Sequence, residues 1–146
     1  MYLSTLKIWN FRKYGTGAED APGLEVQFQD GVNVLIGEND SGKTAIVDAI
    51  RYVLHTKSGE TIYMDEKDFH KEGDNRAKHL KIECLFDGIN EIEAAPFLEW
   101  MGIAKDEEGK ARYCLRVTLN ASLLEDGRVY PQFKAGMGDE GSIMDG

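Results

Sequence analysis

Cysteine and long apolar runs are scarce in this sequence, and each scarcity argues against a class of protein. The two cysteines among 146 residues, Cys84 and Cys114, have no metal-binding spacing, which argues against a zinc module or a disulfide scaffold. We expect both to be buried, reduced thiols. No apolar run is long enough to span a bilayer, and the N-terminus lacks the apolar core of a signal peptide. These absences predict a soluble, cytoplasmic protein with no membrane partner.

Basic charge is also in short supply. The chain has 17 Lys and Arg against 26 Asp and Glu, for a net charge of -9. Residues 1–54 carry 5 basic and 7 acidic side chains, and residues 55–146 carry 12 and 19. An acidic protein repels nucleic acid unless Lys and Arg gather on one face, and the sequence shows no such cluster. Any DNA partner is therefore expected to be held through a longer protein and not mainly by this chain.

Apolar patterning predicts one globular α/β domain. Hydrophobic residues make up 42% of the chain, enough for a core. Alternation predicts strands at Leu3–Trp9, Leu24–Phe28, Leu80–Phe86, Arg112–Leu119 and Arg128–Lys134. The almost wholly apolar run Val32–Ile36 predicts a strand buried on both faces, and helical spacing of apolar residues predicts an amphipathic helix over residues 43–55. This order indicates a mixed sheet with a large antiparallel component.

Other segments carry weaker signals. Thr61–His79 is polar and is expected to be a surface connection, with its acidic run Asp65–Asp68 in solvent. Asp87–Asn90 indicates a turn, a short helix is expected to begin after Pro96, and residues 135–146 are expected to form a loop. Three apolar residues at helical spacing are expected to lie in a core or interface: Phe97, Trp100 and Met101.

The segment GENDSGKT, Gly37–Thr44, matches the phosphate-loop pattern G-x-x-x-x-G-K-[ST] at every fixed position. Glycine permits the backbone conformations that let loop amides surround a phosphate. Lys43 is expected to reach the β- and γ-phosphates of ATP, and the Thr44 hydroxyl to ligate Mg²⁺. A glycine-rich turn that binds nothing would not explain the lysine at the start of the helix. The candidate ATP-binding residues of the loop are Gly37, Asn39, Asp40, Ser41, Gly42, Lys43 and Thr44, with Thr44 as the metal ligand.

Three motifs around the loop carry a family resemblance: Asn10-Phe11-Arg12, Gly31-Val32-Asn33, and Ile46 to Ile50 with Asp48-Ala49 inside it. Together with the two strand-like segments ahead of the loop, they resemble the opening of the ABC-type ATPase heads of RecF, SMC and related DNA-repair proteins. The resemblance implies a P-loop NTPase fold of the ABC/SMC-head type. It also implies two heads associating as a homodimer.

The same resemblance assigns roles outside the loop. Arg12 would lie near the nucleotide phosphates, with Lys13 and Tyr14 lining the same entrance. Asn39 would order the loop or contact the γ-phosphate of a nucleotide held between two heads. Asp48 is expected to pack or cap the helix and not to act in catalysis.

A finer resemblance is to the OLD-family ATP-dependent endonucleases. It is carried by Asp40 in the loop, by the triplet Asp68-Phe69-His70, and by the strand-like runs within residues 114–136. It implies that ATP regulates DNA cleavage or processing. A metal site at His70 with Asp68 and Glu66 is a less favoured alternative to a plain surface loop.

Two parts of a complete ABC-type site cannot be recognised after Thr44: an acidic pair ending an apolar strand, and a Ser-Gly-rich signature motif. Glu125-Asp126 is rejected as the pair because the apolar stretch before it is interrupted. We therefore expect residues 1–146 to be the N-terminal portion of an ABC-type ATPase domain, without the rest of the ATPase or any nuclease domain. This chain would contain no catalytic residue and would bind ATP with little or no hydrolysis.

Two alternatives to an endonuclease stay open. One is a RecF- or SMC-like clamp in which ATP drives association of heads without cutting DNA. The other is a stand-alone or degenerate nucleotide-binding protein. A small-molecule kinase is disfavoured, because its phosphate loop would come almost directly after the first strand.

Overall fold

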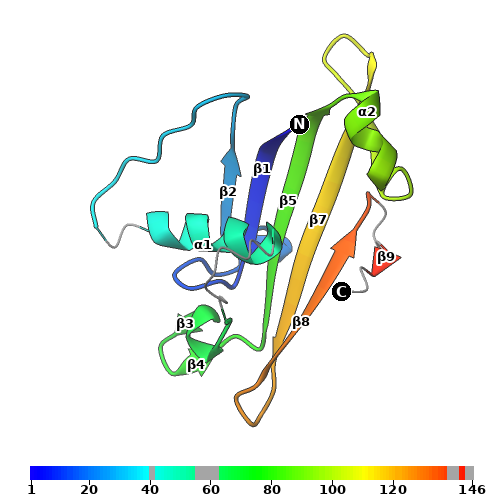
Figure 1. Cartoon of the computed structure of the whole chain (residues 1–146). Helices are drawn as coiled ribbons and strands as arrows, with labels where there is room; N and C mark the ends of the chain where they lie inside the picture. Colours follow the sequence, from blue (N-terminus) through cyan, green and yellow to red (C-terminus); the bar gives the residue numbers. More distant parts are fainter. Residues whose placement is uncertain (40–41, 55–62, 138–141, 144–146) are drawn as a thin grey trace.

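A twisted antiparallel sheet forms the body of the protein, and one helix lies across it (Figure 1). The computed structural model describes residues 1–39, 42–54, 63–137 and 142–143. The strand order is β2-β1-β5-β7-β8-β9, and β6 also pairs with β7. The strands are β1 (Tyr2–Trp9), β2 (Leu24–Gln27), β5 (His79–Ile89), β6 (Met101–Lys105), β7 (Ala111–Leu123), β8 (Val129–Ala135) and β9 (Ser142–Ile143). The α/β class with a large antiparallel component is confirmed, but every strand pairing among the described residues is antiparallel, so a mixed sheet is not seen there.

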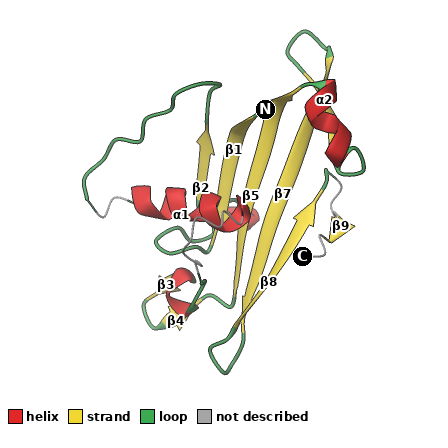
Figure 2. Cartoon of the chain, viewed as in Figure 1, coloured by secondary structure: helices red, strands yellow, loops and turns green. Residues whose placement is uncertain are grey.

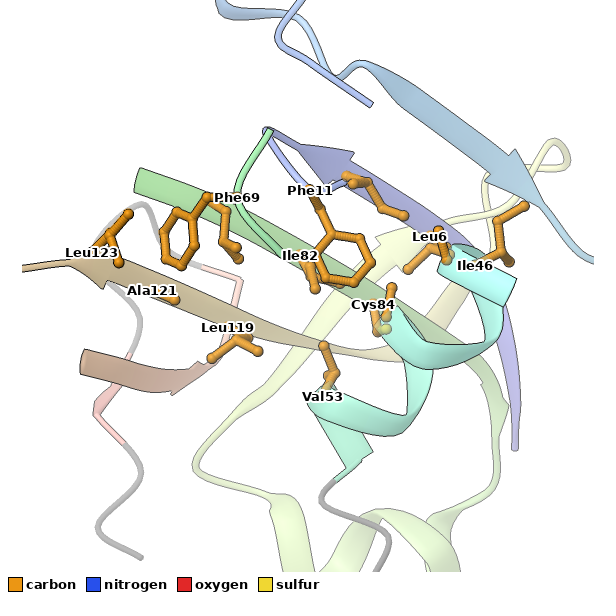
Figure 3. Close-up of a cluster of buried hydrophobic side chains, with 14 residues drawn as sticks. Leu6, Phe11, Ile46, Val53, Phe69, Ile82, Cys84, Leu119, Ala121 and Leu123 are labelled. Carbon is orange, nitrogen blue, oxygen red and sulfur yellow. The ribbon is translucent and has the colours of Figure 1, made fainter. Parts of the chain in front are cut away.

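The core lies between one face of the sheet and helix α1 (Lys43–Leu54). Alternation in β1 buries Leu6 and Ile8 completely, and the same face of β5 buries Ile82 and Cys84. Figure 3 shows Leu6, Ile82 and Cys84 on the side of the sheet that faces Ile46 and Val53 of the helix, as the apolar spacing of the helix predicted. The core cluster consists of Leu6, Ile8, Phe11, Ala45, Ile46, Ala49, Val53, Phe69, Leu80, Ile82, Cys84, Leu119, Ala121 and Leu123.

The predicted strand at Val32–Ile36 is wrong. The structure gives it no strand pairing, and Val32 and Ile36 are 93% and 91% exposed. A doubly buried strand needs neighbours on both sides, and no described residue supplies them. Instead, the Asn33 side chain accepts from the Gln29 amide over 2.9 Å and donates to the Gln29 carbonyl over 2.8 Å, which fixes a local turn.

The turn predicted at Asp87–Asn90 and the helix predicted after Pro96 are also wrong. Strand β5 continues to Ile89, and Asn90 caps helix α2 (Glu91–Ala94), which ends before Pro96. The Asn90 side chain accepts from two backbone amides of α2, and the Glu93 carboxylate accepts from the Asn90 amide. A short 3-10 turn, η3 (Ala95–Phe97), follows with proline in its first turn, where no amide donor is needed.

Cys84 and Cys114 are buried free thiols, as expected. The apolar residues predicted to lie in a core or interface do so, in a second cluster around Ile89, Ala94 and Leu115. The predicted loop at residues 135–146 contains the short strand β9. Among the described residues, no helix combines the length and the apolar character needed to cross a membrane.

The connection predicted as a solvated surface, residues 61–79, is partly buried; Thr61 and Ile62 lie outside the described residues. It contains a 3-10 turn, η2 (Glu66–Asp68), and a small hairpin of β3 (Lys71–Glu72) and β4 (Asn75–Arg76). Asp68 and Phe69 are 6% and 1% exposed. Phe69 forms a β-bridge to Phe11, which draws this connection onto the core beside the first turn of the chain. A single buried pair in a polar segment leaves no periodic signal, so sequence patterning missed it.

Candidate functional site

The phosphate loop, Gly37–Thr44, follows the exposed segment after β2 in the chain and ends in the first turn of α1 (Figure 1). The structure describes it at both ends, at residues 37–39 and from Gly42 onward, while the candidate residues Asp40 and Ser41 lie outside the described residues. Gly37 and Asn39 are exposed. Gly42 has a φ of 98°, in the left-handed region that glycine adopts without strain.

Lys43 connects the two ends of the loop by a hydrogen bond. Its Nζ donates to the carbonyl oxygen of Gly37, which brings the two fixed ends of the motif together. Thr44 follows in the first turn of α1 with its side chain exposed, and that turn contains no acidic residue. No carboxylate within that turn therefore offsets the positive end of the helix. Burial of Ala45, Ile46 and Ala49 anchors this turn to the sheet.

Residues after β1 approach the loop from the other side. The Tyr14 hydroxyl lies 3.4 Å from the Gly42 carbonyl oxygen, and burial raises the pKa of that hydroxyl. A Cβ added at Gly42 would overlap the Tyr14 hydroxyl and lie 3.0 Å from Lys13 Cδ. Gly42 is thus required by close approach as well as by its backbone angle. Lys13 and Tyr14 do border the loop, as the resemblance implies.

Arg12 is held by two carboxylates from different parts of the chain. Its Nη1 donates to Asp48 Oδ2 of α1 over 2.7 Å, and its Nε donates to Asp68 Oδ1 over 2.9 Å. The guanidinium carbon lies 4.9 Å from the centre of the Phe11 ring. The Arg12 backbone amide donates to the Asp68 carbonyl over 2.7 Å, so main chain and side chain make the same connection. Arg12 therefore joins the turn after β1 to α1 and to η2.

This cluster extends to Tyr52 of α1. The Tyr52 hydroxyl lies 3.1 Å from Asp68 Oδ2, an oxygen that also accepts from the Asp65 amide over 3.0 Å. Burial, followed by the Asp68 charge, raises the pKa of Tyr52 to about 12. For Arg12, burial opposes the charged form, but hydrogen bonds to Asp48 and Asp68 outweigh it and leave the guanidinium pKa raised. Both groups keep their protons, which preserves the connection at neutral pH.

Asp48 is part of this cluster and neither caps the helix nor merely packs it. Besides its bond to Arg12, it lies 3.6 Å from Arg51 Nη1 in the next turn of α1. Sequence reasoning treated Arg12, Asp48 and the Asp68-Phe69-His70 triplet separately. The one signal in the sequence was the acidic run Asp65–Asp68. Its first and last residues have the spacing of a capping box, which they form in η2, and this spacing could have indicated an ordered turn at Asp68.

A metal site at His70 gains no support. The His70 Nδ1 lies 2.7 Å from the Arg12 carbonyl oxygen, and Asp68 is already engaged by Arg12 and Tyr52. Across the described ranges, no three His, Cys, Asp or Glu residues come together in a metal-binding group. His70 and Asp68 instead hold the turn after β1 in place.

Known proteins resemble this chain over the region just described. A family profile described as an AAA ATPase domain matches residues 1–137. The DNA replication and repair protein RecF of Pediococcus pentosaceus is 43% identical over 61 residues, 42% of this chain and 14% of that protein. RecF of Cytophaga hutchinsonii is 34% identical over 96 residues, which cover 60% of this chain and 24% of that protein. RecF of Clostridium botulinum is 30% identical over 105 residues, which cover 64% of this chain and 27% of that protein. The chain spans less than a third of these relatives.

A solved structure supports the same fold. It comes from work on the structural biochemistry of ATP-driven dimerization and DNA stimulated activation of SMC ATPases. It aligns with a TM-score of 0.59 at 20% identity and covers 99% of this chain and 73% of that chain. The likeness shows that this chain has the P-loop fold of the ABC/SMC-head type.

Proposed function

The chain belongs to the AAA ATPase domain family, and from this premise we propose that Gly37–Thr44 binds the phosphates of ATP together with Mg²⁺. One observation carries the proposal: the ammonium of Lys43, the first residue of α1, donates a hydrogen bond to the carbonyl oxygen of Gly37, the first residue of the loop. A lysine that already faces the inside of its loop can exchange a neutral carbonyl for a phosphate oxygen. Charge-assisted hydrogen bonds to phosphate are about twice as strong as neutral ones.

The surrounding residues fit a nucleotide phosphate. Gly42 leaves the space that a Cβ would fill, and the N-terminal amides of α1 favour an anion. Asn39, Asp40 and Ser41 would contribute the intervening loop amides. The exposed Thr44 hydroxyl is an oxygen ligand of the kind that Mg²⁺ prefers, and bound Mg²⁺ would neutralise phosphate charge.

Arg12 and its neighbours would assist from the side of the loop. The contacts of its Nε and Nη1 with Asp68 and Asp48 fix the orientation of the guanidinium before any ligand arrives. Lys13 lies against Gly42 and adds a second cation near the loop. A preorganised cation loses less conformational freedom on binding a phosphate than a mobile one does.

For the protein as a whole, we propose an ATP-driven role in DNA repair of the RecF and SMC kind. The curated relatives above are DNA replication and repair proteins, and the similar solved structure concerns ATPases that dimerise with ATP and respond to DNA. By analogy, two heads of this protein would associate as a homodimer around ATP. Sedimentation with and without Mg·ATP tests this association directly.

An OLD-type endonuclease is the second candidate. The observation that favours it is the Asp68-Phe69-His70 triplet together with Asp40 in the loop. Asp68 and His70 both hold the turn after β1, so the triplet serves the ATPase fold. Cleavage of DNA would need a carboxylate cluster in another domain. Nuclease assays on the longer protein distinguish this candidate from the clamp.

We also propose that residues 1–146 form the N-terminal portion of a larger ATPase domain. The apolar segment Val32–Ile36 supports this, because Val32, Val34 and Ile36 are exposed within the described structure. Burying apolar side chains away from water is favourable, so contact with a further part of the domain that covers this segment would be stabilising. This portion alone would bind ATP but would hydrolyse it slowly or not at all.

Calorimetry with Mg·ATP, followed by phosphate release, tests the proposal. We expect the chain to bind ATP, Lys43→Ala to weaken binding at least tenfold, and Lys110→Ala in the distant charged turn to bind normally. Turnover should be negligible in all three. Equal affinities of the chain and Lys43→Ala would contradict the phosphate-loop assignment. Rapid ATP hydrolysis by this chain would contradict the assignment as an incomplete domain, but it would leave the phosphate-loop assignment in place.

A further inference from the structure

The face of the sheet opposite α1 is polar, and neither α1 nor α2 packs against it. Helix α1 lies across one face of the sheet (Figure 2). The apolar residues of β1, β5 and β7 pack toward α1, and the cluster around α2 uses Phe86, Leu115 and Val117 of that same face. The alternate residues of each strand point the other way. We call this second surface the open face.

Strand register brings basic side chains together on the open face. One row of register partners crosses β1, β5, β7 and β8 and consists of Trp9, Lys81, Asn120 and Gln132. The neighbouring row crosses β2, β1, β5, β7 and β8 and consists of Glu25, Lys7, Glu83, Thr118 and Lys134. Arg116 lies opposite Leu85 in a third row. The rows hold four Lys and Arg against two Glu, whereas the whole chain has 17 against 26. Within these rows the fold gathers more basic than acidic side chains, a grouping that the linear sequence does not show.

An open pocket of about 470 Å³ lies at one end of this face, between the turn after β1 and the ends of β5 and β7. Its lining includes Trp9, Asp20, His79, Lys81, Asn120 and Ser122. The Trp9 Nε1 donates to the Asp20 carbonyl over 2.8 Å, which fixes the indole, and Lys81 Nζ lies 4.4 Å from the ring centre. The ring surface is therefore held in a constant position beside a cation.

We propose that the open face binds single-stranded nucleic acid, with one base in the Trp9 pocket and the phosphates along Lys81, Lys7 and Lys134. A base can take the place of the Lys81 ammonium over the indole, and the displaced ammonium can then pair with a phosphate. The Asn120 amide offers a donor and an acceptor to the edge of a base. Lys7 and Lys134 are three strand spacings apart, about 14 Å, which suits a backbone crossing the strands.

Net negative charge weakens this binding but does not prevent it. At moderate salt, charges more than about 10 Å away are largely screened, and packed layers are about 10 Å apart. A phosphate on the open face therefore responds mainly to the side chains of that face. Three acidic side chains oppose a phosphate locally: Glu83, whose Oε2 lies 3.4 Å from Lys81 Nζ, Glu25 opposite Lys7, and Asp20 in the pocket lining.

This proposal concerns a surface separate from the phosphate loop, so its test does not depend on ATP. The Trp100→Phe chain keeps Trp9 as its single tryptophan, and the probe is a labelled oligothymidylate of about twelve nucleotides. We expect quenching of Trp9 on binding and a loss of affinity of about twentyfold between 50 and 200 mM salt, if about three phosphates are neutralised. Trp9→Leu should weaken binding about tenfold.

Charge variants in the same background separate the open face from general electrostatics. Lys81→Gln should weaken binding and reduce the salt slope by about 0.7, whereas Lys110→Gln, which changes the net charge equally, should have no effect. Glu83→Gln should strengthen binding. Urea unfolding shows that each variant is folded.

Three results would overturn the proposal. One is the absence of binding at low salt by a folded chain. Another is an equal effect of Lys81→Gln and Lys110→Gln. The third is equal binding of poly-glutamate with no quenching of Trp9, which would assign the open face to an acidic protein.

Discussion

The guanidinium of Arg12 and the carboxylate of Asp68 lie 56 residues apart in the chain and meet over 2.9 Å, from Nε to Oδ1. Asp68 is buried, and its second oxygen accepts from Tyr52 and from the Asp65 amide. The same guanidinium contacts Asp48 in the helix that begins at the phosphate loop. Arg12 therefore links the position of that helix to a connection that sequence patterning assigned to solvent.

Removing Arg12 should destabilise the fold. Arg12→Gln leaves the buried Asp68 carboxylate without its cation, and we expect the free energy of unfolding to fall by about 2 kcal/mol. Urea unfolding measures this, and a cycle with Asp68→Asn isolates the coupling. Arg51→Gln is the control, since Arg51 lies farther from Asp48 and is more exposed; its loss should stay below about 0.5 kcal/mol. Equal losses in the two variants would contradict the role given to Arg12.

Replacing Gly42 should damage the phosphate loop through Tyr14. Gly42→Ala combines a positive φ with an overlap against the Tyr14 hydroxyl, so ATP affinity should fall and stability should drop by about 2 kcal/mol. Gly109→Ala is a matched control: its φ is 81°, but nothing lies within 4 Å of the new methyl group. It should cost about 1 kcal/mol and leave ATP binding unchanged. Adding Tyr14→Ala to Gly42→Ala should recover part of the loss, and no recovery would count against the contact.

Two isoleucines should respond in opposite ways to truncation. Ile82 is fully buried in the core, so Ile82→Ala should cost about 2–5 kcal/mol. Ile36 is exposed in the segment wrongly predicted as a strand, so Ile36→Ala should change stability by less than about 0.5 kcal/mol. Chemical denaturation of this chain compares them. A loss above about 1.5 kcal/mol at Ile36 would show that the segment is packed in solution.

Stability should decline in alkali. Burial raises the pKa of Cys84 from 9.0 to about 12, and the Tyr52 pKa is raised from 10.0 to about 12. The folded chain holds both protons more tightly than the unfolded chain, so this stabilisation is complete below about pH 9 and is lost as pH rises toward 12. Urea unfolding between about pH 8 and pH 11 should show the decline, with a smaller slope in Cys84→Ala and in Tyr52→Phe. An unchanged slope in both variants would contradict this origin.

Local pattern predicted the parts of the site that lie close together in the chain. Gly37–Thr44 can be recognised because a phosphate loop needs fixed residue types at fixed spacing. Strands β1, β2, β5, β7 and β8 were predictable because one face of each is apolar. The short helix was predicted too late in the chain, because Pro96 was taken as its start. In the structure Asn90 caps it and helix α2 begins at Glu91.

The sequence by itself determined the phosphate loop, the amphipathic helix after it and the alternating strands, since each depends on neighbours within a few residues. Tertiary structure alone decided that Arg12 meets Asp48 and Asp68, and that Lys7, Lys81 and Lys134 share one face of the sheet. These relationships depend on strand register and on long-range packing. Register is set by how the apolar faces fit together over the whole sheet, so no local window of sequence contains it.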